Sequence, residues 1–226
     1  MKRRPVNTMR KTALLLVVGL LALGATSAWA QEGRWVLQPL AGYRTSGSFG
    51  VRPDLEIILP FSGIRIPDGF AYGVSLGYRL SPLVTFEAQW TRSSGTVQAI
   101  ATNALDPNFD LFEMNEDQLH ANFIFYFSDV DFVVRPFFVT GLGATIADAK
   151  VEGVGSTSRF SWNLGLGFEK MFNDKVGIRV QAKWFSTYIN DSAEWWYDYW
   201  WGGWYLIPVS QYMGQWDFTG GLIFRF

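Results

Sequence analysis

The chain has 226 residues, no cysteine and a formal net charge of −1, and 17% of its residues are aromatic. A sequence without cysteine has no disulfide framework and no thiolate chemistry. A nearly neutral charge argues against nucleic acid as a partner, because binding to a phosphate backbone needs a basic surface. The aromatic residues and the 23 glycines suit a β-barrel, which needs an aromatic belt outside and small residues where strands bend.

The first 30 residues have the features of a secretory signal peptide. A basic start precedes an apolar run over Ala13–Ala25, and Ala28-Trp29-Ala30 places small residues where a signal peptidase reads. The apolar run is shorter than the roughly 20 residues that a spanning helix needs. We therefore expect cleavage after Ala30 and a single mature domain over residues 31–226. Met9, which two basic residues follow, is an alternative start for a complete signal.

Alternation of apolar and polar residues with a period of two recurs along the mature chain and predicts eight strands. Each supplies the roughly 9–11 residues that cross a bilayer at a tilt. Pro39 removes a ladder hydrogen bond, so the first strand is expected to be bulged or to start later. The expected strands are Arg34–Arg44, Phe70–Leu80, Leu83–Thr91, Asp117–Phe127, Phe132–Ile146, Ser161–Glu169, Lys175–Trp184 and Trp216–Phe226.

The connections between these strands alternate strictly between short and long. Tight turns are expected at Ser81-Pro82, Ser128–Asp131 and Asn173-Asp174, and long loops at Thr45–Gly69, Ser93–Glu116, Ala147–Ser158 and Ile189–Gly214. Barrels of the bacterial outer membrane have short periplasmic turns and long extracellular loops. The pattern therefore favours an antiparallel up-and-down transmembrane barrel with both ends of the mature chain in the periplasm.

Four tryptophans fit an outer membrane girdle. They are expected to point outward near the extracellular ends of four strands, at the same height, as an interfacial aromatic belt requires. These residues are Trp90, Trp162, Trp184 and Trp216.

The last strand ends on an aromatic residue, which is unusual for a soluble protein because the strand would have an unprotected edge. Gly221, Phe224 and Phe226 resemble the C-terminal signal by which outer-membrane barrels are recognised for insertion. The resemblance implies the barrel-assembly machinery as a partner during insertion.

Over the whole mature sequence, the chain resembles the OmpA-like family of eight-stranded outer-membrane β-barrels. The resemblance rests on Arg135-Pro136-Phe137-Phe138-Val139 with Gly141-Leu142-Gly143, on Trp162-Asn163-Leu164-Gly165-Leu166-Gly167-Phe168, and on the C-terminal Phe226. These motifs imply an architecture and no particular activity.

The inward face of the expected barrel is ionic. Eight strands leave an interior only wide enough for side chains to fill, and unpaired charges there would be costly. We expect Glu87 to pair with lumen cations, either as a structural plug or as the gate of a narrow pore. The expected network comprises Arg79, Glu87, Arg135, Glu169, Lys175, Arg179, Lys183, Asp217 and Arg225.

His120, the only histidine, is expected on the inward face near the acidic stretch Glu113–Asp117. A metal site needs several converging ligands, and one histidine gives weak support. The His-x-Ser-Asn type motif of lipid A deacylating barrels is missing, because Ala121-Asn122-Phe123 follows His120. We expect a structural lumen histidine, with no metal, no cofactor and no enzymatic activity.

The last long loop contains an unusual aromatic cluster. Exposed to water it would form a larger apolar patch than a monomer usually shows. It either folds back over the barrel mouth or binds a partner through rigid aromatic contacts. The first long loop contains the apolar stretch Leu55–Phe61, and packing of this stretch on the cluster would make the two loops one extracellular cap. The cluster comprises Trp195, Trp196, Tyr197, Tyr199, Trp200, Trp201, Trp204 and Tyr205.

The sequence therefore predicts a small plugged barrel with a structural or interaction role, which presents an aromatic surface to partners. The expected partners are outer-membrane lipid, lipopolysaccharide or its sugars, and a protein bound through the extracellular loops. The alternative is a narrow passive channel for small hydrophobic molecules, as in OmpW-like barrels, with the aromatic loop as its entrance.

Overall fold

The computed structural model describes residues 34–45, 47–50, 61–66, 68–101, 108–128, 133–151, 153–188, 194–198, 203–207 and 212–226. The predicted signal peptide and its cleavage site lie outside these residues. The described residues form twelve strands and no helix, so the fold is all-β as predicted. None of them belongs to a helix with the length and apolarity needed to cross a membrane.

The strands are β1 (Trp35–Arg44), β2 (Gly47–Gly50), β3 (Phe61–Ile66), β4 (Gly69–Ser81), β5 (Val84–Ala101), β6 (Phe109–Tyr126), β7 (Arg135–Ala149), β8 (Thr157–Met171), β9 (Val176–Tyr188), β10 (Glu194–Asp198), β11 (Gly203–Ile207) and β12 (Tyr212–Arg225).

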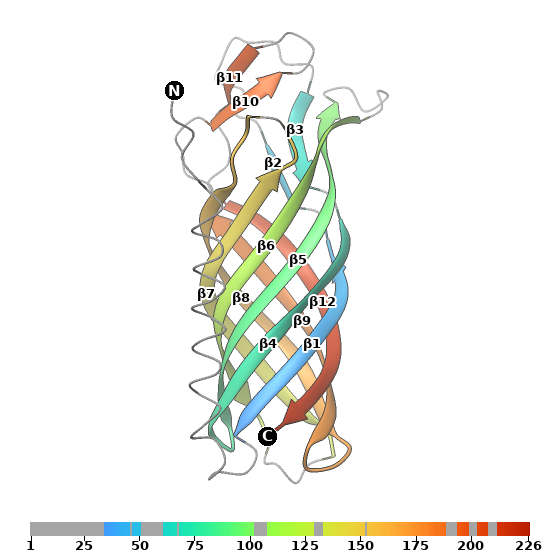
Figure 1. Cartoon of the computed structure of the whole chain (residues 1–226), viewed down its shortest axis with the longest axis vertical. Coiled ribbons are helices and arrows are strands. Elements are labelled where there is room, and N and C mark those ends of the chain that lie inside the picture. The colour runs from blue at the N-terminus through green and yellow to red at the C-terminus, as the bar shows by residue number, and fades with distance from the viewer. Residues whose placement is uncertain are drawn as a thin grey trace.

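Eight strands close into an antiparallel ring, which confirms the predicted barrel (Figure 1). The order around the ring is β1-β4-β5-β6-β7-β8-β9-β12, and β12 pairs again with β1. Beyond the last strand, Trp35 and Phe226 exchange two backbone hydrogen bonds of 3.0 and 3.1 Å. Closure matters because a membrane offers no partner for the open edge of a sheet.

The two ends of the barrel differ in their connections. We call the end with the short connections β4–β5, β6–β7 and β8–β9 the turn end, and the opposite end the loop end. Figure 1 shows the C-terminus at the turn end, and the hairpin of β10 and β11 at the loop end. The longest connection, β9–β12, lies at the loop end as predicted, but the β5–β6 and β7–β8 connections (102–108 and 150–156) are no longer than the β6–β7 connection (127–134), so the predicted strict alternation of short and long connections is wrong.

Across the middle of the barrel, apolar side chains face outward and polar side chains face inward. On β8, Leu166 and Phe168 are 59% and 55% exposed, whereas Asn163 and Glu169 are at most 1% exposed. Successive side chains of a strand point to opposite faces, so this alternation places one set toward lipid and the other in the lumen.

Toward the loop end the alternation reverses, so that apolar side chains face inward and polar side chains face outward. The strands continue through this region, and the predicted loops are therefore too long. β5 continues to Ala101 and β6 begins at Phe109, so most of the expected loop Ser93–Glu116 is strand. Here Val97 and Ala99 are buried, and the partly exposed Gln98 donates a hydrogen bond to Asp110. A strand that has left the hydrocarbon needs a polar outer face, and such a sequence is easily mistaken for a loop.

The other expected loops also contain strands. β2 and β3 pair in the same register as β1 and β4, so the first hairpin extends beyond the ring, and the expected loop Thr45–Gly69 is shorter. β7 and β8 extend into the expected loop Ala147–Ser158. Ile189–Gly214 contains β10, β11 and the start of β12. Most of the apolar stretch Leu55–Phe61 lies outside the described residues, so its packing on the aromatic cluster stays a prediction.

The first strand is regular despite Pro39. β1 begins at Trp35, and its pairing with β12 keeps one register on both sides of the proline. On the other side Pro39 pairs with Val74 of β4. The expected bulge or late start is therefore wrong, because the missing N–H removes one ladder hydrogen bond without shifting the strand.

Candidate functional site

Among the residues that the structure describes, eight charged side chains are buried in the lumen. Each is at most 3% exposed, and charged residues are almost never buried so completely unless they are paired. The set is balanced, with four cations and four carboxylates: Arg44, Arg135, Arg179, Lys183, Glu87, Glu116, Glu169 and Asp217.

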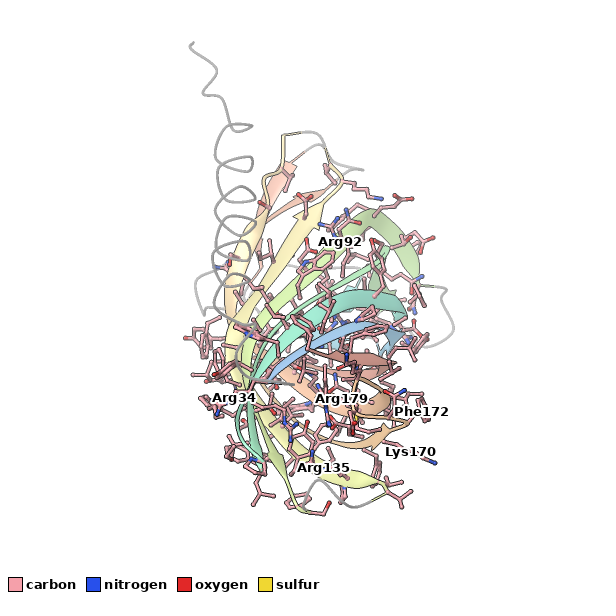
Figure 2. All side chains as sticks on the ribbon, turned by 60° about the horizontal axis from the view of Figure 1, so that its bottom comes forward. Arg34, Arg92, Arg135, Lys170, Phe172 and Arg179 are labelled. Atoms are coloured by element: carbon pink, nitrogen blue, oxygen red, sulfur yellow. The ribbon has the colours of Figure 1, made fainter. Side chains whose placement is uncertain are left out.

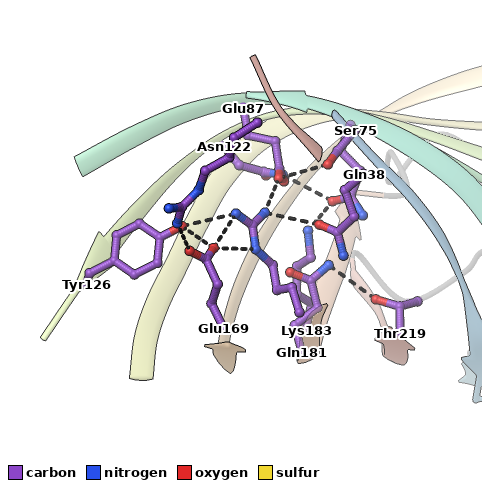
Figure 3. A network of polar contacts seen from close by, with 12 residues as sticks. Gln38, Ser75, Glu87, Asn122, Tyr126, Glu169, Gln181, Lys183 and Thr219 are labelled. Carbon is purple, nitrogen blue, oxygen red and sulfur yellow. Dashed lines mark hydrogen bonds and ion pairs between the residues drawn. The ribbon is translucent and has the colours of Figure 1, made fainter. Parts of the chain in front are cut away.

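Arg179 on β9 is the centre of this network. Figure 3 labels four of its partners, Gln38, Glu87, Tyr126 and Glu169. Its Nη1 lies 2.8 Å from Oε2 of Glu87, and its Nη2 lies 2.9 Å from Oε2 of Glu169. The same guanidinium donates to Oε1 of Gln38 at 3.1 Å and to the hydroxyl of Tyr126 at 3.0 Å. These partners come from β5, β8, β1 and β6, so one side chain links five strands across the lumen.

Amides continue the network around Glu87. Nδ2 of Asn122 donates to Oε1 of Glu87 and to Oε1 of Gln89, both at 3.1 Å. Lys183 also donates to Gln89, and Oγ of Ser75 donates to Glu87 at 2.9 Å. These hydrogen bonds satisfy the carboxylate and reduce the cost of burying it.

A second ionic group lies toward the loop end, around Arg44 on β1. Nε and Nη2 of Arg44 lie 2.7 and 2.9 Å from the two carboxylate oxygens of Asp217 on β12. The guanidinium also donates to Ser93 and Thr91 on β5, at 3.0 and 2.8 Å. Glu116 on β6 completes the group, 3.5 Å from Nη1.

An apolar group lies between these charges and the loop end. The buried residues Ile64, Val97, Met114 and Met213 form one cluster, with Phe112 packed against it. They come from β3, β5, β6 and β12. The lumen is therefore apolar where the strands extend beyond the ring, whereas inside the ring the buried charges lie beside a second apolar cluster of Ile124, Tyr126, Phe137 and Val139.

At the turn end, Glu169 is shared among several arginines. Nη2 of Arg225 lies 2.5 Å from its Oε1, and Nη1 of Arg135 lies 3.6 Å away. Arg135 also donates from Nη2 to the backbone carbonyl of Pro82 at 2.6 Å and stacks 3.9 Å from the ring centroid of Tyr126. Arg135 thereby fixes the β4–β5 turn against β7.

The structure separates two of the expected network residues from the rest. Lys175 is exposed in the turn between β8 and β9, and so it lies outside the lumen network. Arg79 is on the inward face of β4 and half-buried, with no ion pair among the described residues. The turn extends through Lys175, one residue further than the alternation of Lys175–Trp184 predicts, because β9 begins at Val176.

Sequence reasoning missed Arg44 and Glu116. Arg44 follows the inward-facing Gln38 at an even spacing, so the alternation of β1 could have identified it. Glu116 falls in the expected loop Ser93–Glu116, because β6 begins at Phe109 with the opposite alternation of apolar and polar residues.

His120 is buried in the lumen next to a serine. Its Nε2 lies 2.8 Å from Oγ of Ser161, and its ring lies 5.0 Å from the ring of Phe185. Thr145 and Thr187 form a hydrogen bond of 2.9 Å across the same region. In the part of the chain that the structure describes, no three His, Cys, Asp or Glu side chains converge to hold a metal ion.

The four girdle tryptophans lie on the outward face of the ring. Trp162 and Trp184 are in edge-to-face contact, with centroids 5.1 Å apart, and Trp216 pairs in register with Trp184. Trp90 lies on β5, away from this group, and its Nε1 donates to Asp117 at 3.1 Å. An outward ring with a polar partner suits the interface between hydrocarbon and water.

The segment predicted as an aromatic cluster forms an antiparallel hairpin at the loop end. Trp195 pairs with Leu206, Trp196 with Tyr205, and Tyr197 with Trp204. The remaining members, Tyr199, Trp200 and Trp201, lie outside the described residues. The role of this cluster stays a prediction.

The residues of the expected insertion signal differ in their surroundings. Phe224 and Phe226 are 37% and 57% exposed on the outward face. Gly221 faces β1, where a Cβ atom would come within 2.0 Å of the backbone oxygen of Pro39. Close packing of β12 against β1 therefore requires a glycine at position 221, independently of any role of this residue in recognition for insertion.

Comparison with known proteins identifies the family. No curated protein matches the sequence. Neisserial surface protein A (NspA) is similar in structure, with a TM-score of 0.53 and 15% identity over 85% of this chain and 97% of that one. The outer membrane protein OprG from Pseudomonas aeruginosa has a TM-score of 0.55 and 11% identity over 87% of this chain and 97% of that one. At these identities the likeness shows the fold. Residues 13–214 match the outer membrane protein beta-barrel domain, so the chain belongs to this family of bacterial outer-membrane barrels.

Proposed function

We propose that the protein is a closed, non-catalytic barrel that serves as a rigid membrane scaffold for an extracellular interaction surface. The observation that carries this proposal is the position of Arg179, which bridges Glu87 and Glu169 across the lumen with no exposed surface of its own. A buried, fully paired charge of this kind resists displacement, because separating the pair leaves two unpaired charges at low dielectric.

Two further features support a closed lumen. Arg44, Asp217 and Glu116 form a separate ionic group toward the loop end. Beyond it, Val97 and Met213 belong to an apolar cluster that hydrated ions would have to cross. An eight-stranded barrel has little interior left once such side chains fill it.

In this proposal the turn end faces the periplasm and the loop end faces the outside, in keeping with short turns and longer loops in bacterial outer-membrane barrels. The hairpin of β10 and β11 then presents the cluster over Trp195–Tyr205 to lipopolysaccharide, membrane lipid or a protein partner. Tryptophan and tyrosine give large contact areas at low entropic cost, which suits such a surface.

A passive channel for small hydrophobic molecules is the second candidate. The apolar cluster of Ile64, Val97, Met114 and Met213 favours it, since a hydrophobic solute entering from the loop end would meet these side chains first. The two methionines are flexible and adapt to different shapes. Such a solute would still have to pass the ionic groups or leave sideways between strands.

Conductance of the refolded chain in planar bilayers tests the two candidates. A closed scaffold gives no conductance for the wild type or for Glu87→Gln, and the variant loses thermal stability because Arg179 loses a partner. Reproducible wild-type conductance that changes in Glu87→Gln would instead establish a pore. Flux of a hydrophobic dye into liposomes, measured on the same preparation, covers solutes that carry no current.

A deletion of residues 195–204 tests the interaction surface. We expect it to abolish binding to vesicles that contain lipopolysaccharide, or capture of an outer-membrane protein partner, without changing barrel stability. Deletion of residues 152–155 in the β7–β8 connection is the matched control. Binding that survives the first deletion would refute the proposed surface.

A further inference from the structure

Positive charge is in excess at the turn end of the lumen. Toward the loop end Arg44 faces Glu116 and Asp217, and Lys183 lies between the two groups, within electrostatic range of Glu87 and Asp217. Toward the turn end, the four guanidiniums of Arg79, Arg135, Arg179 and Arg225 face two carboxylates, Glu87 and Glu169, which leaves an excess of two positive charges among the described residues.

Three of these arginines form a group at the mouth itself. Arg79, Arg135 and Arg225 lie on the inward faces of β4, β7 and β12, and each is within electrostatic range of the other two. Arg135 and Arg225 both converge on Oε1 of Glu169, and Arg79 has no ion pair with a described residue. Figure 2, turned so that the turn end comes forward, labels Arg135 at this end.

Two of the guanidinium nitrogens in this group make no hydrogen bond with a described residue, although one of them, Nη1 of Arg135, lies 3.6 Å from Oε1 of Glu169. Nη1 of Arg135 and Nε of Arg225 are buried and have no hydrogen-bond partner among the described residues. Arg135 is only 2% exposed, and an unpaired buried donor on a charged group costs more than a neutral one. Guanidiniums donate in a planar fork that fits the oxygens of phosphate and carboxylate. An oxyanion at the mouth would give these nitrogens an acceptor.

The mouth is reachable from outside the barrel. Arg79 and Arg225 are partly exposed, while hydrogen bonds to the backbone oxygens of Pro82 and Ser128 hold Arg135 in place. On the outward face of the same end, Phe168 and Phe226 are more than half exposed, as expected at the edge of the hydrocarbon. A soluble anion and the headgroup of a lipid both reach this level.

We infer that the turn-end mouth of the barrel binds a phosphate group on Arg79, Arg135 and Arg225. The site goes beyond the proposed scaffold role, and it depends neither on a closed lumen nor on the aromatic hairpin. If phosphate does not bind at the mouth, the proposed scaffold function still stands. If the scaffold function is refuted, the phosphate site still stands.

Titration with inorganic phosphate, followed by the NMR signals of the arginine Nε–H groups, tests the site. The probe is added at constant ionic strength to the chain from Gln31, refolded in a zwitterionic detergent. We expect the Arg225 signal to shift and saturate, and the Arg44 signal to stay unchanged, because Arg44 lies in the other ionic group. The absence of a saturable shift of Arg225 would overturn the inference, and this result needs no variant.

Charge-matched variants distinguish a built site from diffuse attraction. Arg79→Gln is expected to weaken phosphate binding at least tenfold, and Arg79→Lys to restore part of it. Lys170→Gln and Lys175→Gln remove the same charge from exposed positions at the same end and are expected to leave affinity unchanged. Equal weakening by these controls would overturn the site. Heat modifiability on a gel shows that each variant is folded.

Two further experiments identify what occupies the site. In nanodiscs of phosphatidylglycerol, a lipid occupant shifts the Arg225 signal without added phosphate and prevents further titration, whereas a soluble occupant leaves the site free to bind added phosphate.

The sequence also contains Asp129 and Asp131, which lie outside the described residues. Phosphate binding seen only in the double variant Asp129→Asn/Asp131→Asn would mean that these carboxylates hold the arginines, and would overturn the inference.

Discussion

Arg44 and Asp217 join the first and last strands of the ring by a two-point ion pair. Nε and Nη2 of Arg44 lie 2.7 and 2.9 Å from the two oxygens of Asp217, and both side chains are almost completely buried. The two residues are also register partners between β1 and β12. A contact between residues far apart in the chain therefore fixes the seam at which the barrel closes.

Asp217→Asn should destabilise the barrel by about 3 kcal/mol, since the longer contact to Glu116 is then the remaining ion pair of Arg44 among the described residues. Urea unfolding in lipid vesicles, followed by tryptophan fluorescence, measures the change. Asp110→Asn is the control, because Asp110 is exposed and hydrogen-bonded only to Gln98 among the contacts described. Equal losses in the two variants would contradict a special role of the seam.

Tyr126→Phe should lower the free energy of unfolding by about 1.5–3 kcal/mol, the range for a hydrogen bond to a charged group. The hydroxyl donates to Glu169 at 2.7 Å and accepts from Arg179 at 3.0 Å. Tyr212→Phe, at an exposed position near the loop end, removes the same atom outside the lumen. A loss of stability no larger than that of Tyr212→Phe would show that the hydroxyl contributes nothing to the network.

The edge-to-face pair of Trp162 and Trp184 should contribute about 1 kcal/mol beyond the burial of each ring. A double-mutant cycle with Trp162→Leu and Trp184→Leu measures this coupling free energy in vesicles. The same cycle between Trp162 and Trp90, which lie on strands that do not pair, is expected to give a value near zero. Equal coupling in both cycles would mean that the effect comes from the bilayer rather than from ring contact.

Gly221→Ala should prevent complete closure of the ring, because its Cβ would lie 2.0 Å from the backbone oxygen of Pro39. The expected result is a reduced folded fraction after refolding into vesicles, where no assembly machinery is present. Gly155→Ala is the control, since a Cβ there meets no atom within 4 Å. Normal refolding together with failed insertion in cells would assign Gly221 to recognition instead.

Much of the fold was predictable because a barrel repeats a simple pattern. The outward Leu166 and the inward Glu169 follow directly from period-two alternation, which is fixed by backbone geometry. The ring of eight strands follows in the same way and is confirmed, whereas the strict alternation of short and long connections is wrong, because the strands extend into two of the expected long loops. The errors lie where the pattern meets a boundary, as at Lys175 in a turn and at Glu116 beyond the expected strand end.

The sequence by itself determined which face of each strand a residue occupies, because alternation needs only the neighbours along the chain. Only the tertiary structure decided which inward residues meet. Arg179 reaches Glu87 and Glu169 because the stagger between strands sets the height of each side chain in the lumen, and that stagger is a property of the whole ring. For the same reason, the sharing of Glu169 among three arginines and the two guanidinium nitrogens at the turn-end mouth that lack a described hydrogen-bond partner appear only in the closed barrel.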